Sequence, residues 1–228
     1  MHMPIPIRGV LSVPFWVAGI RQSRMHPNLC TICETMFKRV QRKKQISTDT
    51  TVLFADLRGY TGATQSSDAG QVSDMLNMFY DQCASAVWEY DGIVNKFIGD
   101  AVLAIFNFPI RQKDHARQAV LAGKEIQRRC AEKKLMLKDE EGKDCLMGIG
   151  IGIHTGDTSV GQFGHTAKDF TFIGSVVNIA SRVQAVANMG DVVVTEQVFR
   201  HVSDLFPQSE AQTHQVKGID YPIIAHRV

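Results

Sequence analysis

The 228-residue sequence contains no apolar run long enough to cross a lipid bilayer as a helix. The run Val10–Ile20 has only eleven residues and contains Pro14, and no secretory signal peptide is predicted. These absences argue against a membrane-spanning protein and predict a cytoplasmic location. Phe15 and Trp16, with arginines nearby, leave open a peripheral contact with a membrane surface as well as packing against the protein itself.

Cysteine is scarce, and the number of cysteines is odd. The five cysteines include one CxxC pair, Cys30 and Cys33, and His26 is the only further ligand nearby. A structural zinc or iron site needs four ligands, and no thioredoxin-like pattern surrounds the pair, so both of these readings have weak support. The cysteine content argues against a disulfide framework and predicts reduced thiols.

Acidic residues are nearly absent from the start of the chain. Residues 1–46 carry eight Lys or Arg and only Glu34 as an acid, which gives +7 there, whereas the whole chain carries +2. We therefore expect a basic N-terminal arm with a linker helix over residues 1–46, the helix covering 29–45, and a folded domain over residues 47–228. The arm fits an anionic membrane surface, a protein partner or a solvated helix face, and we expect no nucleic acid as a partner.

The sequence does contain an alternation of strand and helix patterns. The expected elements are a strand ending at Asp56, a helix over Asp68–Tyr90, a β-hairpin around Gly99-Asp100, a helix over residues 114–134 and a strand over residues 146–154. This β-α-β-β-α-β order predicts an α+β protein with a ferredoxin-like, palm-type core.

Further strands and helices are expected after this core. They are a turn at Thr155–Asp157, a strand at Asp169–Phe172, a helix at Ser175–Ala187, a strand at Val192–Thr195, a short helix at Glu196–Val202 and a hairpin around Gly218. We also expect Asp114 and Ser175 to cap their helices.

Two carboxylates are brought together by this fold. In a ferredoxin-like sheet the end of the first strand lies beside the hairpin, which places Asp56 near Asp100. Such a pair can hold two divalent cations for phosphoryl displacement. Asn178 and Arg182 share one helix face, where an Arg can stabilise charge growing on a phosphate. Taken singly, each residue also has a simpler reading, such as a turn cap for Asp56 or a solvated face for Asn178 and Arg182.

The motifs taken together resemble the class III nucleotidyl cyclase catalytic domain, the adenylyl and guanylyl cyclase family. The similarity covers residues 50–217. It rests on FADLRGYT, VNKFIGDAVLAIF, GIGIHTG, DFTFIGSVVNIASRV and QVKG, which occur in the order of the family.

The resemblance implies a role for each matching residue. Asp56, Asp100 and the carbonyl of Leu57 would bind the metals, and the N–H groups of Gly59, Tyr60 and Thr61 would bind phosphate. Asn178 and Arg182 would act on the transition state, and Lys217 would bind the triphosphate. Lys96 and Thr171 would recognise the base. In this family, Lys and Thr at the positions of Lys96 and Thr171 favour ATP, whereas guanylyl cyclases typically have Glu and Cys at these positions. Without the resemblance, Lys96 reads as an edge-strand residue that points to water.

The implied activity is that of a bacterial-type adenylyl cyclase. It would convert ATP into 3′,5′-cyclic AMP and pyrophosphate with two divalent cations, Mg²⁺ or Mn²⁺. The family acts as head-to-tail dimers in which one chain supplies the metal carboxylates and the other the Asn/Arg pair, so a homodimer is implied. The alternatives are a guanylyl cyclase and a cyclase-like domain that binds nucleotide without turnover.

Overall fold

A computed structural model describes residues 45–228 except 66, 110, 139–141 and 164–168, together with residues 14, 17, 20, 21, 30–32, 34 and 35. Most of the predicted basic arm and linker helix, including His26 and Cys33, lies outside the described residues. Cys30 is described and is buried. No helix among the described residues is long and apolar enough to cross a membrane.

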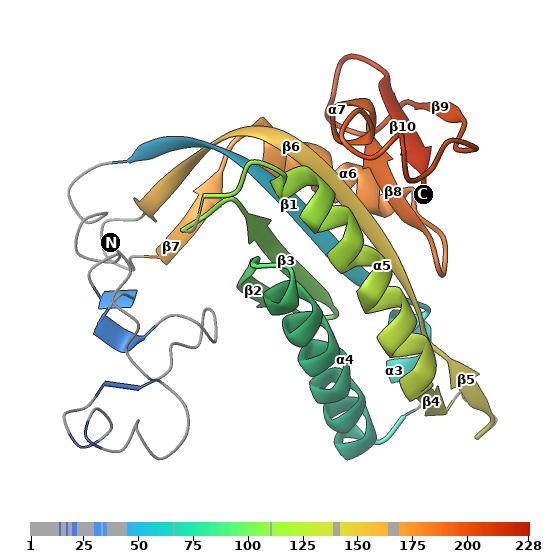
Figure 1. Cartoon of the computed structure of the whole chain (residues 1–228). Helices are drawn as coiled ribbons and strands as arrows, with labels where there is room; N and C mark the ends of the chain where they lie inside the picture. The colour runs from blue at the N-terminus through green and yellow to red at the C-terminus, as the bar shows by residue number, and fades with distance from the viewer. Residues whose placement is uncertain are drawn as a thin grey trace.

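A mixed sheet forms the centre of the domain (Figure 1). Its strand order is β2-β3-β1-β6-β8-β10-β9, with β7 pairing only with β6, and β6–β8 is the parallel pair among these strands. The strands are β1 (Ile46–Arg58), β2 (Ile93–Ile98), β3 (Ala101–Phe106), β6 (Gly148–Phe163), β7 (Asp169–Ile173), β8 (Val192–Thr195), β9 (Ala211–His214) and β10 (Ile223–Arg227). A separate small hairpin is formed by β4 (Met136–Lys138) and β5 (Asp144–Leu146).

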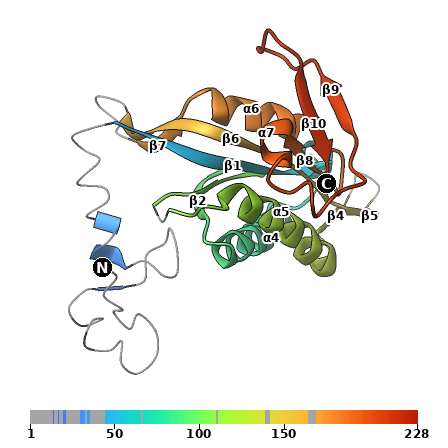
Figure 2. The same ribbon diagram turned by 45° about the horizontal axis from the view of Figure 1, so that its top comes forward.

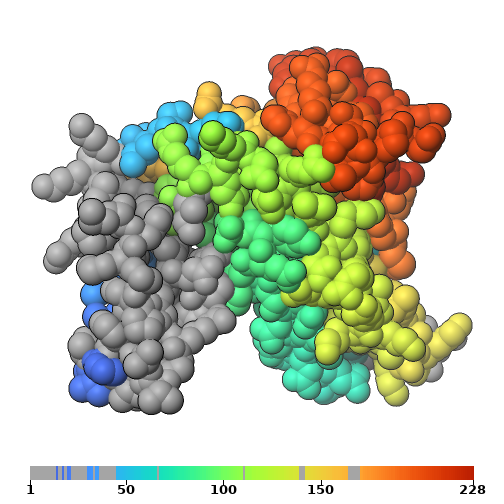
Figure 3. Space-filling view, in the orientation of Figure 1, coloured from blue at the N-terminus to red at the C-terminus, as the bar shows by residue number. Residues whose placement is uncertain are grey.

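Helices cover both faces of this sheet (Figure 2). The helices are α3 (Tyr60–Thr64), α4 (Ala69–Glu89), α5 (His115–Lys133), α6 (Ser175–Ala185) and α7 (Glu196–Phe199). The long helices α4 and α5 pack on one face and make up much of the surface seen in Figure 3, whereas α6 packs on the other face. The predicted ferredoxin-like core is confirmed, because β1, α4, β2, β3, α5 and β6 follow one another along the chain and form the β2-β3-β1-β6 part of the sheet.

Each sheet face has its own apolar core. Leu53, Ala55 and Leu57 of β1 pack toward α4 and α5. Val52 and Phe54 alternate with them and pack toward Val176 and Ala180 of α6. Because side chains alternate along a strand, Asp56 also lies on the α6 face.

The predicted turn at Thr155–Asp157 is wrong, because these residues lie inside β6. This strand pairs with β1 without a break from Ile46↔Val160 to Arg58↔Gly148. Gly156 supplies the irregularity that resembled a turn: its φ is 155°, and a Cβ there would lie 3.0 Å from Cγ2 of Val176. The glycine therefore lets α6 approach a continuous strand.

The helix ends differ from the predictions in detail. Asp68 caps α4, accepting hydrogen bonds from the N–H groups of Gly70 and Gln71 at 2.9 and 3.4 Å. Asp114 occupies the N-cap position of α5 as expected, but its carboxylate accepts from the Gln118 side chain at 2.8 Å and makes no cap bond to the backbone. The expected cap by Ser175 is wrong, since this residue begins α6 and Gly174 occupies the cap position.

Candidate active site

The two predicted metal carboxylates lie close together. Asp56 of β1 is paired in register with Ala101, the residue after Asp100, and the Leu57 N–H donates to the Asp100 carbonyl at 3.2 Å. The pKa of Asp56 is raised by its burial and next by the negative charge of Asp100. The predicted hairpin is confirmed, with Asp100 in the turn between β2 and β3.

The Asp56 carboxylate has two protein donors that the sequence reasoning missed. Oδ2 accepts from Gln184 Nε2 at 3.1 Å and from Arg58 Nη1 at 3.3 Å, and both contacts oppose the rise in pKa. Arg58 could have been found from its position, because residues two apart in a strand share a face. Gln184 has no such local signal, since it lies 128 residues from Asp56.

The hairpin that carries Asp100 is anchored on α4. The Tyr80 hydroxyl donates to the Gly99 carbonyl, and the rings of Tyr80 and Phe97 lie 4.3 Å apart between centroids. The pKa of the Tyr80 phenol is raised by burial and by the neighbouring Tyr60 and Asp100. Tyr80 is thus a further residue near the carboxylates that sequence reasoning did not single out.

The predicted phosphate-binding residues follow directly after β1. Gly59 takes a left-handed conformation, with φ of 85°, as the residue before α3. Tyr60 and Thr61 form the first turn of this short helix. The N–H groups of a first helical turn have no partner within the helix, which leaves them available to an anion.

Among the residues that the structure describes, Asn178, Arg182 and Lys217 have no polar interaction with the two carboxylates. Asn178 and Arg182 are both exposed on α6, one turn apart. Asn178 borders a cavity of about 220 Å³ together with residues 218–221 of the β9–β10 loop, which follow directly after Lys217. No hydrogen bond or ion pair joins Asn178, Arg182 or Lys217 to Asp56 or Asp100 within the described part of one chain.

The two predicted base-recognition residues lie on different strands. Lys96 of β2 is directly opposite Leu103, which packs toward α6, so Lys96 lies on the same sheet face as Asp56. It also borders a cavity of about 480 Å³ between α4 and β2. Thr171 of β7 pairs with Gly161 of β6, so that β3, β1 and β6 separate the two residues within the sheet.

The donor set at Asp56 and Asp100 fits a hard divalent cation. Two carboxylates that repel each other are stabilised by a cation between them, and their oxygens are the ligands that Mg²⁺ and Mn²⁺ prefer. Among the described residues no group of three or more His, Cys, Asp or Glu side chains could hold a metal. A cation here would therefore need main-chain, water or substrate oxygens as well.

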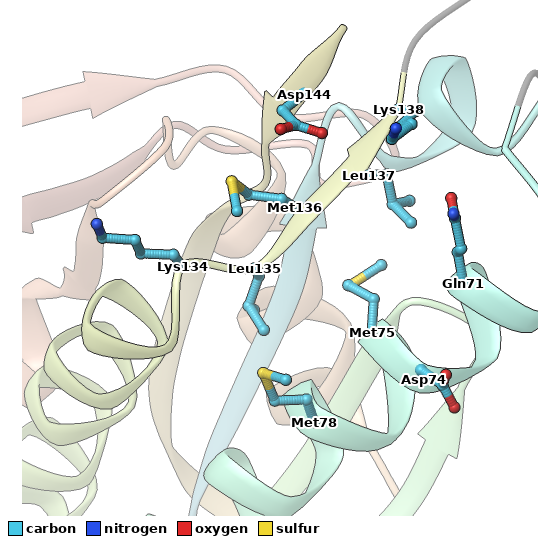
Figure 4. A pocket seen from close by; sticks show the side chains of 10 residues that line it. All are labelled: Gln71, Asp74, Met75, Met78, Lys134, Leu135, Met136, Leu137, Lys138 and Asp144. Atoms are coloured by element: carbon cyan, nitrogen blue, oxygen red, sulfur yellow. The ribbon is translucent and has the colours of Figure 1, made fainter. Parts of the chain in front are cut away.

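A separate groove lies between α4 and the β4–β5 hairpin (Figure 4). It measures about 350 Å³, and its lining combines apolar side chains, among them Met75, Met78 and Met136, with an equal number of polar or charged ones. None of the predicted site residues lines it. The groove is therefore distinct from the carboxylate site.

Comparisons with known proteins agree with the fold. A family model described as the adenylate and guanylate cyclase catalytic domain matches residues 42–226. The chain is 30% identical over 186 residues to an adenylate cyclase of Anabaena cylindrica, which is 78% of this chain and 36% of that protein. The chain thus spans about a third of the length of this relative and less of the length of the others.

Two solved structures share the fold over 81% of this chain. One is the guanylyl cyclase Cya2, with a TM-score of 0.71, 25% identity and 93% of its own chain covered. The other is the adenylyl cyclase CyaB from P. aeruginosa, with a TM-score of 0.70, 27% identity and 95% covered.

Proposed function

The chain belongs to the family of adenylate and guanylate cyclase catalytic domains, and from this premise we propose that it converts ATP into 3′,5′-cyclic AMP and pyrophosphate. The observation that carries the proposal is that Asp56, at the end of β1, lies close to Asp100, at the tip of the β2–β3 hairpin. This is the place where a phosphoryl-transfer site needs two carboxylates.

Asp56, Asp100 and the Leu57 carbonyl would hold the divalent cations. When bound, Mg²⁺ or Mn²⁺ lowers the pKa of the ribose 3′-OH and offsets charge on the phosphates. The N–H groups of Gly59, Tyr60 and Thr61 then bind the β- and γ-phosphates, as expected for the first turn of a helix.

The remaining residues act on the ribose and the reacting phosphorus. Arg182 stabilises the negative charge that develops at the α-phosphate as the 3′-oxygen attacks, and Asn178 orients the ribose. Lys217 supplies a positive charge for the triphosphate. Asn178 and the loop after Lys217 border one cavity, which supports their acting on the same substrate.

We infer that a complete site requires two copies of the chain. Asn178 and Arg182 are exposed on α6 and make no hydrogen bond or ion pair with Asp56 or Asp100 in the described part of one chain. In a head-to-tail homodimer the carboxylates of one copy would face the Asn/Arg pair of the other, which gives two equivalent sites.

ATP is the proposed substrate because of Lys96 and Thr171. A Lys ammonium can donate to adenine N1, and a Thr hydroxyl can accept from the adenine N6 amine. A guanylyl cyclase is the alternative, supported by the similarity to Cya2. Binding without turnover is less well supported, because each catalytic residue type of the family motifs is present in this sequence.

Product analysis of the purified protein tests the function. Incubation with ATP or GTP, each with Mn²⁺ or Mg²⁺, should yield cyclic AMP as the main product, separated and quantified by chromatography. A preference for GTP would support the guanylyl alternative. Nucleotide binding by calorimetry without any cyclic product over hours would contradict both activities.

A further inference from the structure

We propose that Gln184 is a positioning residue for the metal-binding carboxylate of Asp56. The proposal rests on the proposed function, since it takes Asp56 as a metal ligand. It goes further because it assigns a role to a helix residue that is not among the predicted metal, phosphate or base positions. Gln184 lies near the C-terminal end of α6, the helix that also carries Asn178 and Arg182.

The Gln184 side chain lies on the buried face of α6. The residue is 8% exposed, and its Nε2 donates to Asp56 Oδ2 at 3.1 Å and, more weakly, to the Gly150 carbonyl at 3.4 Å. A buried amide needs partners for its polar atoms, so the bond to Asp56 fixes both side chains at once.

Arg58 completes the arrangement. Its Nη1 donates to the same Oδ2 of Asp56 at 3.3 Å, while Nη2 donates to the main-chain carbonyl of Gln184. Both donors therefore hold one oxygen of Asp56. Oδ1 has no hydrogen-bond partner among the described residues and is not sealed from solvent, so it is the oxygen available to a cation.

Two glycines make room for this contact. A Cβ at Gly152 would lie 2.1 Å from the main-chain nitrogen of Gln184, and one at Gly150 would lie 2.4 Å from Arg58 Nε. A side chain at Gly152 would therefore push the α6 backbone away, and one at Gly150 would displace the end of the Arg58 side chain. The alternating glycines of the LMGIGIGIH segment thus permit the Gln184–Asp56 bond.

The same helix would then contribute to two active sites. Gln184 touches the carboxylate of its own chain, whereas Asn178 and Arg182 are proposed to act in the site whose carboxylates belong to the partner. Residues that hydrogen-bond to metal ligands typically change metal affinity or activity 10- to 100-fold when they are replaced. We expect an effect of this size on the Asp56 site.

Metal binding gives a readout that does not depend on turnover. Mn²⁺ alone is titrated into the full chain, and free Mn²⁺ is measured by electron paramagnetic resonance. Gln184→Leu should weaken Mn²⁺ binding at least ~10-fold. Gln184→Met, which keeps an unbranched side chain without a donor, serves as a second variant in case the first does not fold.

The matched control is Gln127→Leu. Gln127 is a partly buried amide of α5 that donates to the carbonyls of Ile149 and Asp191 at 2.7 and 3.1 Å and makes no contact with Asp56. It should keep the Mn²⁺ affinity of the wild type. Equal Mn²⁺ affinity in the Gln184 and Gln127 variants would overturn the proposal.

Heterodimers locate the effect. In a pair made of Arg182→Ala and Asp56→Ala chains, only the Arg182→Ala chain supplies carboxylates to the intact site. Adding Gln184→Leu to that chain should raise the Mn²⁺ concentration needed for activity, whereas adding it to the Asp56→Ala chain should not. The reverse pattern would mean that Gln184 acts through Arg182, which contradicts the proposal.

These experiments separate two failures. If the wild-type protein makes no cyclic nucleotide, the proposed function fails, and the Mn²⁺ titration still decides whether Gln184 supports the carboxylate. If the heterodimer is active but Gln184→Leu leaves the Mn²⁺ affinity unchanged, only the role of Gln184 fails.

Discussion

Asp56 and Asp100 are held close together although their charges repel. The pKa of Asp56 is raised by burial and by Asp100, which means that its ionised form is less stable in the folded protein than in the unfolded chain. Above the ordinary pKa of a carboxyl group this pair therefore lowers the stability of the metal-free protein. Such a cost is common where residues are placed for function.

Asp100→Asn tests this cost directly. Without metal at pH 7, the variant should have a free energy of unfolding about 1 kcal/mol higher than the wild type, because the repulsion is removed. It should also lose the stabilisation that Mn²⁺ gives the wild type. Urea denaturation with and without Mn²⁺ measures both effects, and a less stable metal-free variant would contradict the prediction.

His154 is a second buried ionisable group, outside the proposed site. Burial lowers its pKa from 6.5 to about 4, and Nδ1 lies 2.8 Å from the Thr195 hydroxyl. Because the unfolded chain takes up the proton first, stability falls as the pH drops from about 6.5 to about 4. Protonation of this ring alone should lower the free energy of unfolding by about 2 kcal/mol between pH 7 and pH 5.

His154→Gln should remove this part of the pH dependence. The Gln amide can still form a hydrogen bond with Thr195 but does not titrate. Urea unfolding at pH 7 and pH 5 should show a smaller loss of stability for the variant than for the wild type. An equal loss in both proteins would show that His154 is not the group responsible.

The single residues also show how far the sequence could lead. Asp56 and Asp100 could be predicted because Asp56 stands at the end of a strand pattern and Asp100 stands in the turn between two such patterns. Gln184 could not, because a lone Gln among apolar helix residues gives no sign that it bonds to a strand 128 residues away. Arg58 likewise reads as a surface charge until α6 is placed beside it.

At the scale of the elements, a local pattern predicts a hairpin correctly but misplaces a turn inside a strand whose continuity depends on long-range pairing. The β2–β3 hairpin follows from Gly99-Asp100 between two apolar runs, which is a local pattern. The continuity of β6 through Thr155–Asp157 depends on its pairing with all of β1. The turn predicted there was wrong because pairing along thirteen residues of β1 outweighs a local Gly-Asp signal.

Gly152→Ala tests how tightly β6 and α6 are packed. The added Cβ would meet backbone atoms of Gln184 at 2.1 and 2.4 Å, so the helix must shift. The free energy of unfolding should fall by about 3 kcal/mol.

Gly62→Ala is the control for this substitution. A Cβ at Gly62 has no heavy atom within 4 Å, so its stability should stay within about 1 kcal/mol of the wild type. If Gly152→Ala is as stable as this control, the result would contradict the close packing of α6 on β6.

For the whole molecule, the order of elements was enough to predict the core but not its extensions. The β-α-β-β-α-β order leads to the β2-β3-β1-β6 sheet. The positions of β8, β10 and β9 on one side, and of β7 beside β6, depend on how α6 and α7 pack, which no local pattern records. In one chain the carboxylates and the Asn178/Arg182 pair stay apart, so the site is proposed to be completed by a second copy.

The central claim is that two copies of the chain share each active site, and mixing two inactive variants tests it most directly. Asp56→Ala and Arg182→Ala chains, carrying different tags, are co-expressed and assayed for cyclic AMP. Each homodimer should be inactive, and the mixture should recover about a quarter of wild-type activity, since half of the dimers would have one intact site. Asp56→Ala mixed with Asp100→Asn is the control and should stay inactive, because both changes damage the same half. No recovery in the first mixture, or equal recovery in the control, would contradict the shared site.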